Sequence, residues 1–296
     1  MIEPGVGPGL LKAAAAALAF GLFSIWIAVE YRDGANLGGA LLLRLVGTLP
    51  MLAIVWRHRR HLQALLRNRS SLAALVVTQA LTATAYVAAL ELAPTADVVT
   101  VVYAYPALTF LGAVLLGWVA PSARAAVAVI TCFAGVAIAV GGPSGGADPL
   151  GLALAGGAAV AYAVALLLTQ RLLVEGDALL LASLVSLSAG LLQVCAVSVV
   201  EPPVLPDGLE GWSAGLATGL VSTTFGYVVL YSAIGSIGAS IASVVLSLEL
   251  VTALAGAAVI LGDPIGAHTV VGAALIFLAV VLVGRSRRPR IGEIVP

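Results

Sequence analysis

The sequence predicts an all-α membrane protein with ten transmembrane helices, arranged as two inverted five-helix repeats. The prediction rests on composition, on the length of the apolar runs and on an internal repeat. Residues of the Ala, Val, Ile, Leu, Met, Phe, Trp, Tyr and Cys types make up 61% of the 296-residue chain, and charged residues only 9%. A soluble domain carries about 25% charged residues on its solvated surface. The apolar side chains of this chain are therefore expected to face lipid.

Ten apolar runs are each long enough to cross the hydrocarbon layer of a membrane, which takes about 20 helical residues. They are apolar on all sides, whereas the strands of a membrane barrel alternate at every second residue. A count of nine or eleven spans stays open, because only Pro94 and two carboxylates separate the third run from the fourth. The predicted spans are Leu10–Val29, Leu37–Trp56, Leu72–Leu92, Thr95–Trp118, Ala123–Val140, Leu150–Gln170, Ala178–Val200, Gly211–Ser232, Ile237–Leu261 and His268–Gly284.

The positions of the basic residues predict the orientation of these spans. Cytoplasmic segments of membrane proteins are enriched in Lys and Arg. A cytoplasmic N-terminus leaves only Arg32 in an outer connection and Arg44 inside a span, and it places Glu30, Asp33, Asp148, Glu201, Asp207 and Glu210 outside. We therefore expect a multi-pass protein of the cell (inner) membrane with both termini cytoplasmic. The other basic residues, all cytoplasmic in this orientation, are Lys12, Arg57, Arg59, Arg60, Arg67, Arg69, Arg124, Arg171, Arg285, Arg287, Arg288 and Arg290.

The two halves of the chain share a pattern. A tyrosine-containing span is followed by an apolar helix that closes on Leu-Gly, by a turn with proline and by a further apolar helix. A five-helix unit has an odd number of spans, so two such units insert in opposite orientations, as in many secondary transporters. We predict the two repeats at residues 1–145 and 146–296. The matched positions are Tyr86 and Tyr227, Gly117 and Gly262, and Pro121 and Pro264.

The stretch from Trp212 to Asp263 resembles the EamA-like ten-helix exporters of the drug/metabolite transporter (DMT) superfamily. The resemblance is carried by Trp212-Ser-Ala-Gly-Leu-Ala-Thr-Gly, by Gly238-Ala-Ser-Ile-Ala-Ser up to Glu249-Leu, and by Leu261-Gly-Asp. Arg44 and the run from Gly151 through Tyr162 to Gln170-Arg171 also fit that family. The chain departs from it at Leu250, where Pro is common, and at Phe20-Gly21, where Trp usually precedes Gly. The resemblance implies a central cavity among the first, third, fourth, sixth, eighth and ninth helices.

Two charged residues inside predicted spans are functional candidates, because a charge at the bilayer centre costs about 3 kcal/mol. Glu249 is expected either to carry a proton or to pair with a solute ammonium, and the alternative is a structural hydrogen bond between helices. Small residues near Glu249 favour close packing. Arg44 is expected to pair with Glu91 or Asp97, and the alternative is binding of a solute carboxylate. The small face of Gly211, Gly215 and Gly219 predicts a close helix contact.

Polar and aromatic residues on the helices that the resemblance places around the cavity form the candidate substrate site. Tyrosine can stack on an apolar solute and hydrogen-bond its polar end. The alternative for tyrosines near span ends is an interfacial belt. Pro106 is expected to kink the fourth span beside them. The candidate substrate-binding residues are Gln79, Thr82, Tyr86, Tyr103, Tyr105, Tyr162, Ser222, Thr223, Tyr227, Ser243, Ser247 and Glu249.

The sequence predicts a transporter rather than an enzyme. It contains no HExxH, no Walker GxxxxGK[ST] and no GxSxG motif, so no catalytic residue, cofactor or metal ligand is expected. The predicted function is secondary active export of small zwitterionic or neutral metabolites, such as amino acids, by alternating access, with the proton as a candidate driving ion. Efflux of multiple drugs or lipophilic cations, and a non-catalytic membrane scaffold, are the alternatives. Expected partners are the small-molecule substrate and lipid, but no nucleic acid, for a monomer or weak dimer.

Overall fold

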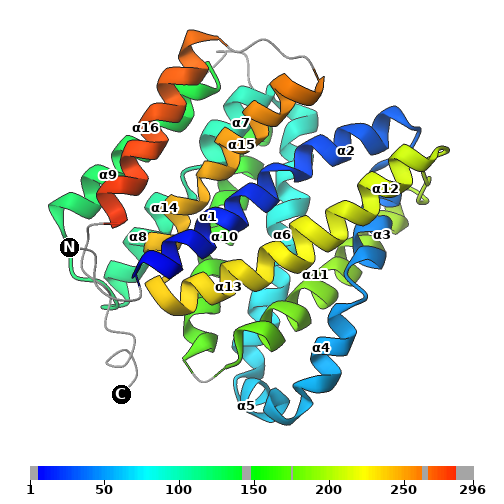
Figure 1. Cartoon of the computed structure of the whole chain (residues 1–296), viewed down its shortest axis with the longest axis horizontal. Helices are drawn as coiled ribbons and strands as arrows, with labels where there is room; N and C mark the ends of the chain where they lie inside the picture. Colours follow the sequence, from blue (N-terminus) through cyan, green and yellow to red (C-terminus); the bar gives the residue numbers. More distant parts are fainter. Residues whose placement is uncertain (1–5, 142–147, 175, 262–265, 285–296) are drawn as a thin grey trace.

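Helices packed side by side form one bundle in the computed structural model of the chain, which describes residues 6–141, 148–174, 176–261 and 266–284. The structure is 86% helix, and the described residues contain no strand. The first half contains α1 (Val6–Gly21), α2 (Phe23–Arg32), α3 (Leu37–Gly47), α4 (Met51–Arg57), α5 (Leu62–Arg67), α6 (Arg69–Leu92), α7 (Thr95–Val102), α8 (Tyr105–Leu115) and α9 (Ala123–Ala139) (Figure 1).

The second half continues with two long helices and then with segmented ones. Two of its segments are π-helices, η2 and η3. The elements are α10 (Pro149–Leu173), α11 (Ala178–Val200), α12 (Leu209–Ala217), η2 (Thr218–Phe225), α13 (Gly226–Ile237), α14 (Ala239–Leu246), α15 (Leu248–Gly256), η3 (Ala257–Leu261) and α16 (Ala267–Gly284).

Within the described residues, seven helical segments are long and apolar enough to cross a membrane, and an eighth is the bent pair α3–α4, whose halves meet at 41°. Two shorter apolar helices, α9 and α16, pack along each other at one edge of the bundle (Figure 1). Each of these falls on one of the ten predicted spans. The chain is therefore a multi-pass helical membrane protein, while ten crossings and the inverted repeat stay predictions. The seven segments are Gly7–Arg32, Arg69–Leu90, Thr95–Leu115, Pro149–Leu173, Ala178–Val200, Leu209–Ile237 and Ala239–Ile260.

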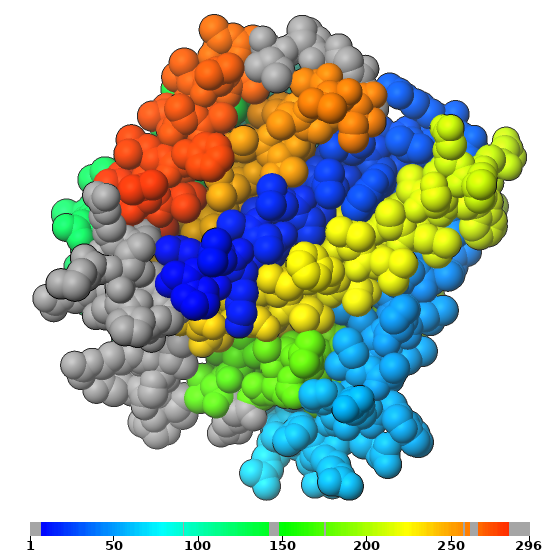
Figure 2. All heavy atoms as spheres, viewed as in Figure 1, coloured from blue at the N-terminus to red at the C-terminus, as the bar shows by residue number. Residues whose placement is uncertain are grey.

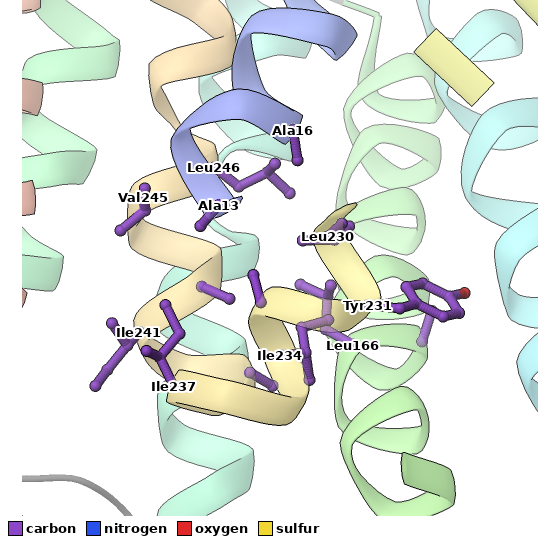
Figure 3. Packing of buried hydrophobic residues seen from close by; sticks show 14 of the residues in the cluster. Ala13, Ala16, Leu166, Leu230, Tyr231, Ile234, Ile237, Ile241, Val245 and Leu246 are labelled. Atoms are coloured by element: carbon purple, nitrogen blue, oxygen red, sulfur yellow. The ribbon is translucent and has the colours of Figure 1, made fainter. Parts of the chain in front are cut away.

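The N-terminal helices pack between helices of the second half of the chain. The α1–α2 segment lies between α14–α15 on one side and α12–α13 on the other (Figure 2). Alanines make this possible, because Ala13 and Ala16 of α1 have no exposed surface and bring the α1 backbone close to its neighbours (Figure 3). Leu230 and Ile234 of α13 and Leu246 of α14 belong to the same buried cluster.

The predicted close contact of the small residues on the eighth span is confirmed. A Cβ atom added to Gly215 would lie 2.7 Å from Leu43 Cβ, and one added to Gly47 would lie 2.7 Å from Gly219 Cα. Both distances are shorter than van der Waals contact allows. The α3 backbone and the eighth span therefore touch along this face, as small residues permit in membrane helices.

Hydrogen bonds between connecting segments join the two halves at both ends of the α3–α4 pair. At the start of α3, the Asn36 side chain donates to Pro202 O (3.0 Å) and accepts from the Val204 amide (2.8 Å). Asp33 Oδ2 accepts from the amides of Gly208 and Gly211. At the end of α4, His58 Nδ1 lies 2.6 Å from Asp177 Oδ2. Both Asn36 and Asp177 also cap the helices that follow them.

Candidate functional site

Eight of the twelve candidate residues lie in two groups rather than in one ring. The first, which we call the aromatic cluster, consists of Tyr86, Tyr103, Tyr105, Tyr162 and Glu249. The second, which we call the Arg44 pocket, is a small pocket that is partly open to the surroundings. It is lined by Leu41, Arg44, Leu45, Thr48, Gln79, Ala83, Ser186, Ala189, Gly190, Gln193, Thr223 and Tyr227.

The aromatic cluster is built where the fourth predicted span breaks. Helix α7 ends at Val102 and α8 starts at Tyr105, with Pro106 in its first turn. Proline has no amide hydrogen and disfavours helical backbone before it, so the break at residues 103–104 confirms that Pro106 interrupts the span. The break places Tyr103 and Tyr105 with their ring centroids 5.7 Å apart.

Tyr162 of α10 completes the ring stack. Its ring centroid lies 4.7 Å from that of Tyr105, with a 59° angle between the ring planes. Such tilted pairs are favourable, because the edge of one ring meets the face of the other. Tyr105 is buried and donates a long hydrogen bond, 3.3 Å, to Ser243 O of α14. The two halves of the chain therefore meet in this cluster.

Glu249 lies in the first turn of α15, directly after the break between α14 and α15. Its carboxylate interacts electrostatically with Tyr86, Tyr103, Tyr105 and Tyr162. No described residue donates a hydrogen bond to it, and no described cation lies within ion-pair distance. The carboxylate therefore lies among aromatic hydroxyl groups without a positive partner from the described part of the chain.

In the Arg44 pocket, the Arg44 guanidinium contacts a hydroxyl group along one edge and an aromatic ring on one face. Arg44 Nε donates to Thr223 Oγ1 (2.8 Å), and the guanidinium carbon lies 5.2 Å from the centroid of the Phe23 ring. Thr223 belongs to the π-helix η2, and its hydroxyl also donates to Thr218 O five residues earlier. Short π-helical segments of this kind are frequent at functional sites.

Among the described side chains, no ion pair between Arg44 and Asp97 is present, so that part of the expectation is not met. No described carboxylate lies within 4.0 Å of its guanidinium, and the side chain of Glu91 lies outside the described residues. Arg44 faces the eighth span and α11 instead, because α3 packs against those elements. The contacts of Arg44 with described residues therefore include a hydroxyl group and an aromatic face.

Tyr227 connects the two groups. Its hydroxyl accepts a hydrogen bond from Gln79 Nε2 at 2.6 Å inside the Arg44 pocket. Its ring packs edge to face on Phe20 (5.0 Å) and on Tyr231 (5.9 Å), and it interacts electrostatically with Glu249. Phe20, where the resembling family usually has Trp, therefore still contributes an aromatic wall. Polar groups therefore extend from Arg44 and Gln79 to Tyr227, which also lies within electrostatic range of Glu249.

Four candidate hydroxyl groups bind backbone carbonyls instead of facing the pocket. Thr82 donates to Thr78 O (2.8 Å), and Ser222 donates across helices to Ala19 O (2.5 Å). Ser243 and Ser247 donate to carbonyls one turn earlier, and neither has exposed surface. Ser243 and Ser247 of the ninth span, although expected at the substrate site, therefore do not line the Arg44 pocket. Of the twelve candidates, the Arg44 pocket is lined by Gln79, Thr223 and Tyr227.

Sequence reasoning missed three polar residues. Gln193 and Ser186 of α11 line the Arg44 pocket, although the seventh span was not expected at the cavity. Glu30, expected in an outer connection, lies within α2 and is fully buried. The signal for Gln193 was present, because an amide inside a 23-residue apolar helix is as unusual there as Gln79 is in α6. No feature of the sequence indicated that Glu30 is buried, because this residue follows directly after the predicted span.

Comparison with known proteins gives a match to a family and matches to solved structures. Residues 149–285 match the model of the EamA-like transporter family. A protein of known crystal structure superposes on the chain with a TM-score of 0.77, over 93% of this chain and 95% of that chain. The two sequences are 17% identical, so this likeness establishes the fold alone. No curated protein matches the chain by sequence.

Proposed function

We propose that the chain is a secondary active exporter of small zwitterionic or neutral metabolites, because residues 149–285 match the model of the EamA-like transporter family. Amino-acid-like solutes are the substrate class, and alternating access is the mechanism. Family and helical composition make it a membrane transport protein. The substrate class, the direction and the driving ion belong to the proposal.

The observation that carries the substrate class is the Glu249 carboxylate among tyrosine side chains with no described cationic partner. An unpaired charge at membrane depth is costly, and intramembrane acids commonly serve substrates or protons. A solute ammonium would offset that cost through the carboxylate and through the aromatic faces, which attract cations. Tyr86, Tyr103, Tyr105 and Tyr162 supply those faces.

The small number of basic groups argues against strongly anionic solutes. Arg44 is the only basic residue that lines the pocket. A sugar phosphate or nucleotide sugar carries at least two negative charges and would need further cations, because buried charges require partners. One acidic group in the aromatic cluster and one basic group in the Arg44 pocket suit a solute with one charge of each sign, or a neutral polar solute.

Alternating access is supported by where the two halves touch. The Asp33 and Asn36 side chains hold the segment at residues 202–211, and His58 holds Asp177 at the opposite end of α3–α4. A carrier opens one end while the other stays closed. These two sets of bonds are in the right places to act as such contacts. The proton reaching Glu249 is the proposed coupling ion, since the sequence contains no nucleotide-binding motif.

The substitution Glu249→Gln tests this function. Proteoliposomes containing the purified protein are loaded with a mixture of labelled amino acids, and release is followed with and without a pH gradient. We expect Glu249→Gln to lower gradient-driven release by tenfold or more, on the order of the loss of one charge-assisted interaction. Glu210→Gln is the matched control, because Glu210 is an exposed acid at the start of α12.

Release that is unchanged by Glu249→Gln would remove both proton coupling and ammonium binding from this residue. Release that is slow but still accelerated by the gradient would leave ammonium binding and remove coupling. The control separates these results from a general effect of losing an acid, since Glu210→Gln is expected to transport like the unchanged protein.

Efflux of lipophilic cations is the second candidate function, and the aromatic cluster favours it. A carboxylate surrounded by tyrosine faces also suits a quaternary ammonium group. Survival of expressing cells on quaternary ammonium compounds and dyes, compared with toxic amino-acid analogues, separates the two functions. Resistance to the amino-acid analogues alone is the expected result.

A further inference from the structure

Polar groups in the Arg44 pocket lack partners. Gln193 is 5% exposed and forms no hydrogen bond with another described residue, while Ser186 Oγ is buried without a partner in the described part of the chain. Two helical turns separate these residues, so they lie on the same face of α11. Buried polar groups in folded proteins are almost always hydrogen-bonded. A bound molecule is therefore expected to supply the missing partners.

Arg44 adds a positive charge without a described carboxylate partner to the same pocket. Its Nε is bound to Thr223 and one face lies over Phe23, which fixes the plane of the guanidinium. An arginine at membrane depth costs about 3 kcal/mol unless it is paired, and none of the described carboxylates pairs with it. A fixed guanidinium offers parallel N–H groups with the spacing of the two oxygens of a carboxylate.

The number of hydrogen-bond donors in the Arg44 pocket and its single positive charge suit one carboxylate group. A carboxylate has about four acceptor positions, and Arg44, the Gln193 amide and the Ser186 hydroxyl supply donors from two helices. A phosphate dianion would bring a second charge into a pocket with a single basic residue.

We infer that the Arg44 pocket is the carboxylate subsite of the transported solute, with Gln193 and Ser186 as further donors. The inference deepens the proposed function and rests on it for the identity of the ligand as cargo. The Tyr227 hydroxyl accepts a hydrogen bond from Gln79 in this pocket, and Tyr227 also interacts electrostatically with Glu249. A zwitterion therefore binds with its carboxylate at Arg44 and its ammonium on the side of Glu249. The tyrosines of the aromatic cluster then contact the part of the solute between its two charged groups.

Binding is measured by thermal unfolding of the detergent-solubilised protein with matched pairs of probes. The pairs are acetate and acetamide, glycine and glycinamide, and L-leucine and L-leucinamide, which differ at the carboxylate. We expect each acid to raise the Tm and each amide at equal concentration to raise it less. Inorganic phosphate serves as the alternative anion, and protein in phosphatidylglycerol or phosphatidylcholine vesicles tests a lipid headgroup.

Variants assign the effect to the pocket. Arg44→Gln is expected to abolish the difference between acid and amide, while Arg44→Lys retains part of it, because lysine keeps the charge without the planar fork. Gln193→Leu keeps the charge and the packing volume, and it is expected to weaken acid binding by about tenfold. If Arg44→Gln fails to fold, the Gln193→Leu variant tests by itself whether this pocket binds the carboxylate. Arg69→Gln, which changes an exposed arginine at the start of α6, is the control.

Equal protection by acids and amides overturns the inference, as does stronger protection by phosphate or by phosphatidylglycerol. Transport distinguishes this failure from failure of the proposed function. If labelled L-leucine is released and L-leucinamide competes as well as the acid, the function stands and the carboxylate subsite is wrong. If no solute is transported but acids still protect the unchanged protein and not Arg44→Gln, the subsite stands and the function is wrong.

Discussion

Glu30 is a carboxylic acid without solvent access, at 0% exposure, in the contact between α2 and the eighth span. One oxygen accepts a 3.3 Å hydrogen bond from Thr218, and Oε2 has no partner in the described part of the chain. Its neighbours include the backbone of Gly215, where an added Cβ would lie 2.9 Å from Oε2. Burial of a carboxylate with one weak hydrogen bond is costly.

A neutral group of the same shape is therefore expected to fit this position better. We predict that Glu30→Gln keeps or raises the Tm of the detergent-solubilised protein, while Glu30→Ala lowers stability by about 2 kcal/mol, since it leaves a cavity between tightly packed helices. Thermal unfolding of the two variants side by side is the measurement. A larger loss for Glu30→Gln than for Glu30→Ala would mean that the negative charge itself is needed.

Among single residues, the sequence located candidates better than it located their contacts. Glu249 and the tyrosines do lie near one another, because residues of the helices expected at the cavity meet in the bundle. Ser243 and Ser247 were expected at the substrate site, but their hydroxyl groups bind carbonyls of their own helix and both residues are buried. A polar face on one helix does not reveal whether the neighbouring helix covers it.

At the scale of elements, the contact between α3 and the eighth span is formed by backbone rather than by side chains. A Cβ atom on Gly219 would lie 2.5 Å from Gly47 Cα and would also collide with Arg44 O. The same contact orients Arg44 toward Thr223 in the next turn of that span. Helix proximity and the geometry of the Arg44 pocket therefore depend on the same two glycines.

We predict that Gly219→Ala lowers stability by about 2 kcal/mol, since overpacking a close contact typically costs about 1–3 kcal/mol. Gly156→Ala on α10 is the matched control, because its added Cβ would meet nothing within 4 Å. That control is expected to be neutral or to stabilise by up to about 1 kcal/mol, since alanine favours helix over glycine. Chemical and thermal unfolding in detergent measure both. Equal effects at the two positions would contradict a close contact at Gly219.

The breaks within spans were only partly foreseeable. Proline marks the α7–α8 break at Pro106 and the bend before α4 at Pro50. The π-helix η2 has no proline, and its position follows from packing against α1, α3 and α11. The local sequence identifies a break where a residue such as proline cannot continue the helix. A π-helical turn depends instead on packing against helices that are distant in the sequence.

On the scale of the whole molecule, the two halves are joined at opposite ends of α3–α4, by Asp33 and Asn36 at one end and by His58–Asp177 at the other. Asp177 caps α11 through the amides of Leu179 and Leu180 while it binds His58. Burial raises the pKa of Asp177, but the hydrogen bonds from His58 and from these amides outweigh it and hold the pKa below its ordinary value of 3.8.

The lowered pKa fixes the sign of a pH effect. The stabilisation from Asp177 is fully present above pH 3.8, the ordinary value, and it is lost as the pH falls through the lowered folded-state pKa. Asp177→Asn keeps a capping oxygen but removes the charge. We therefore predict a lower Tm for Asp177→Asn than for the unchanged protein at neutral pH, and a gap that closes in acid.

Thermal unfolding of both proteins over a series of acidic and neutral buffers measures that gap. Asp148→Asn is the matched control, since Asp148 caps α10 through the Leu150 amide without a histidine partner. A smaller gap is expected there. A gap for Asp177→Asn that widens in acid would reverse the predicted sign.

The sequence by itself determined that the chain is a helical membrane protein, where most helices lie, and that its second half matches the model of the EamA-like transporter family. Hydrophobic length sets these features locally, because a lipid environment forces each apolar run to satisfy its own backbone as a helix. Only the tertiary structure decided that Arg44 faces Gln193 and Thr223 instead of a carboxylate, and that Glu30 is buried. Those outcomes depend on how helices rotate and approach one another, and glycine contacts between distant segments set that arrangement.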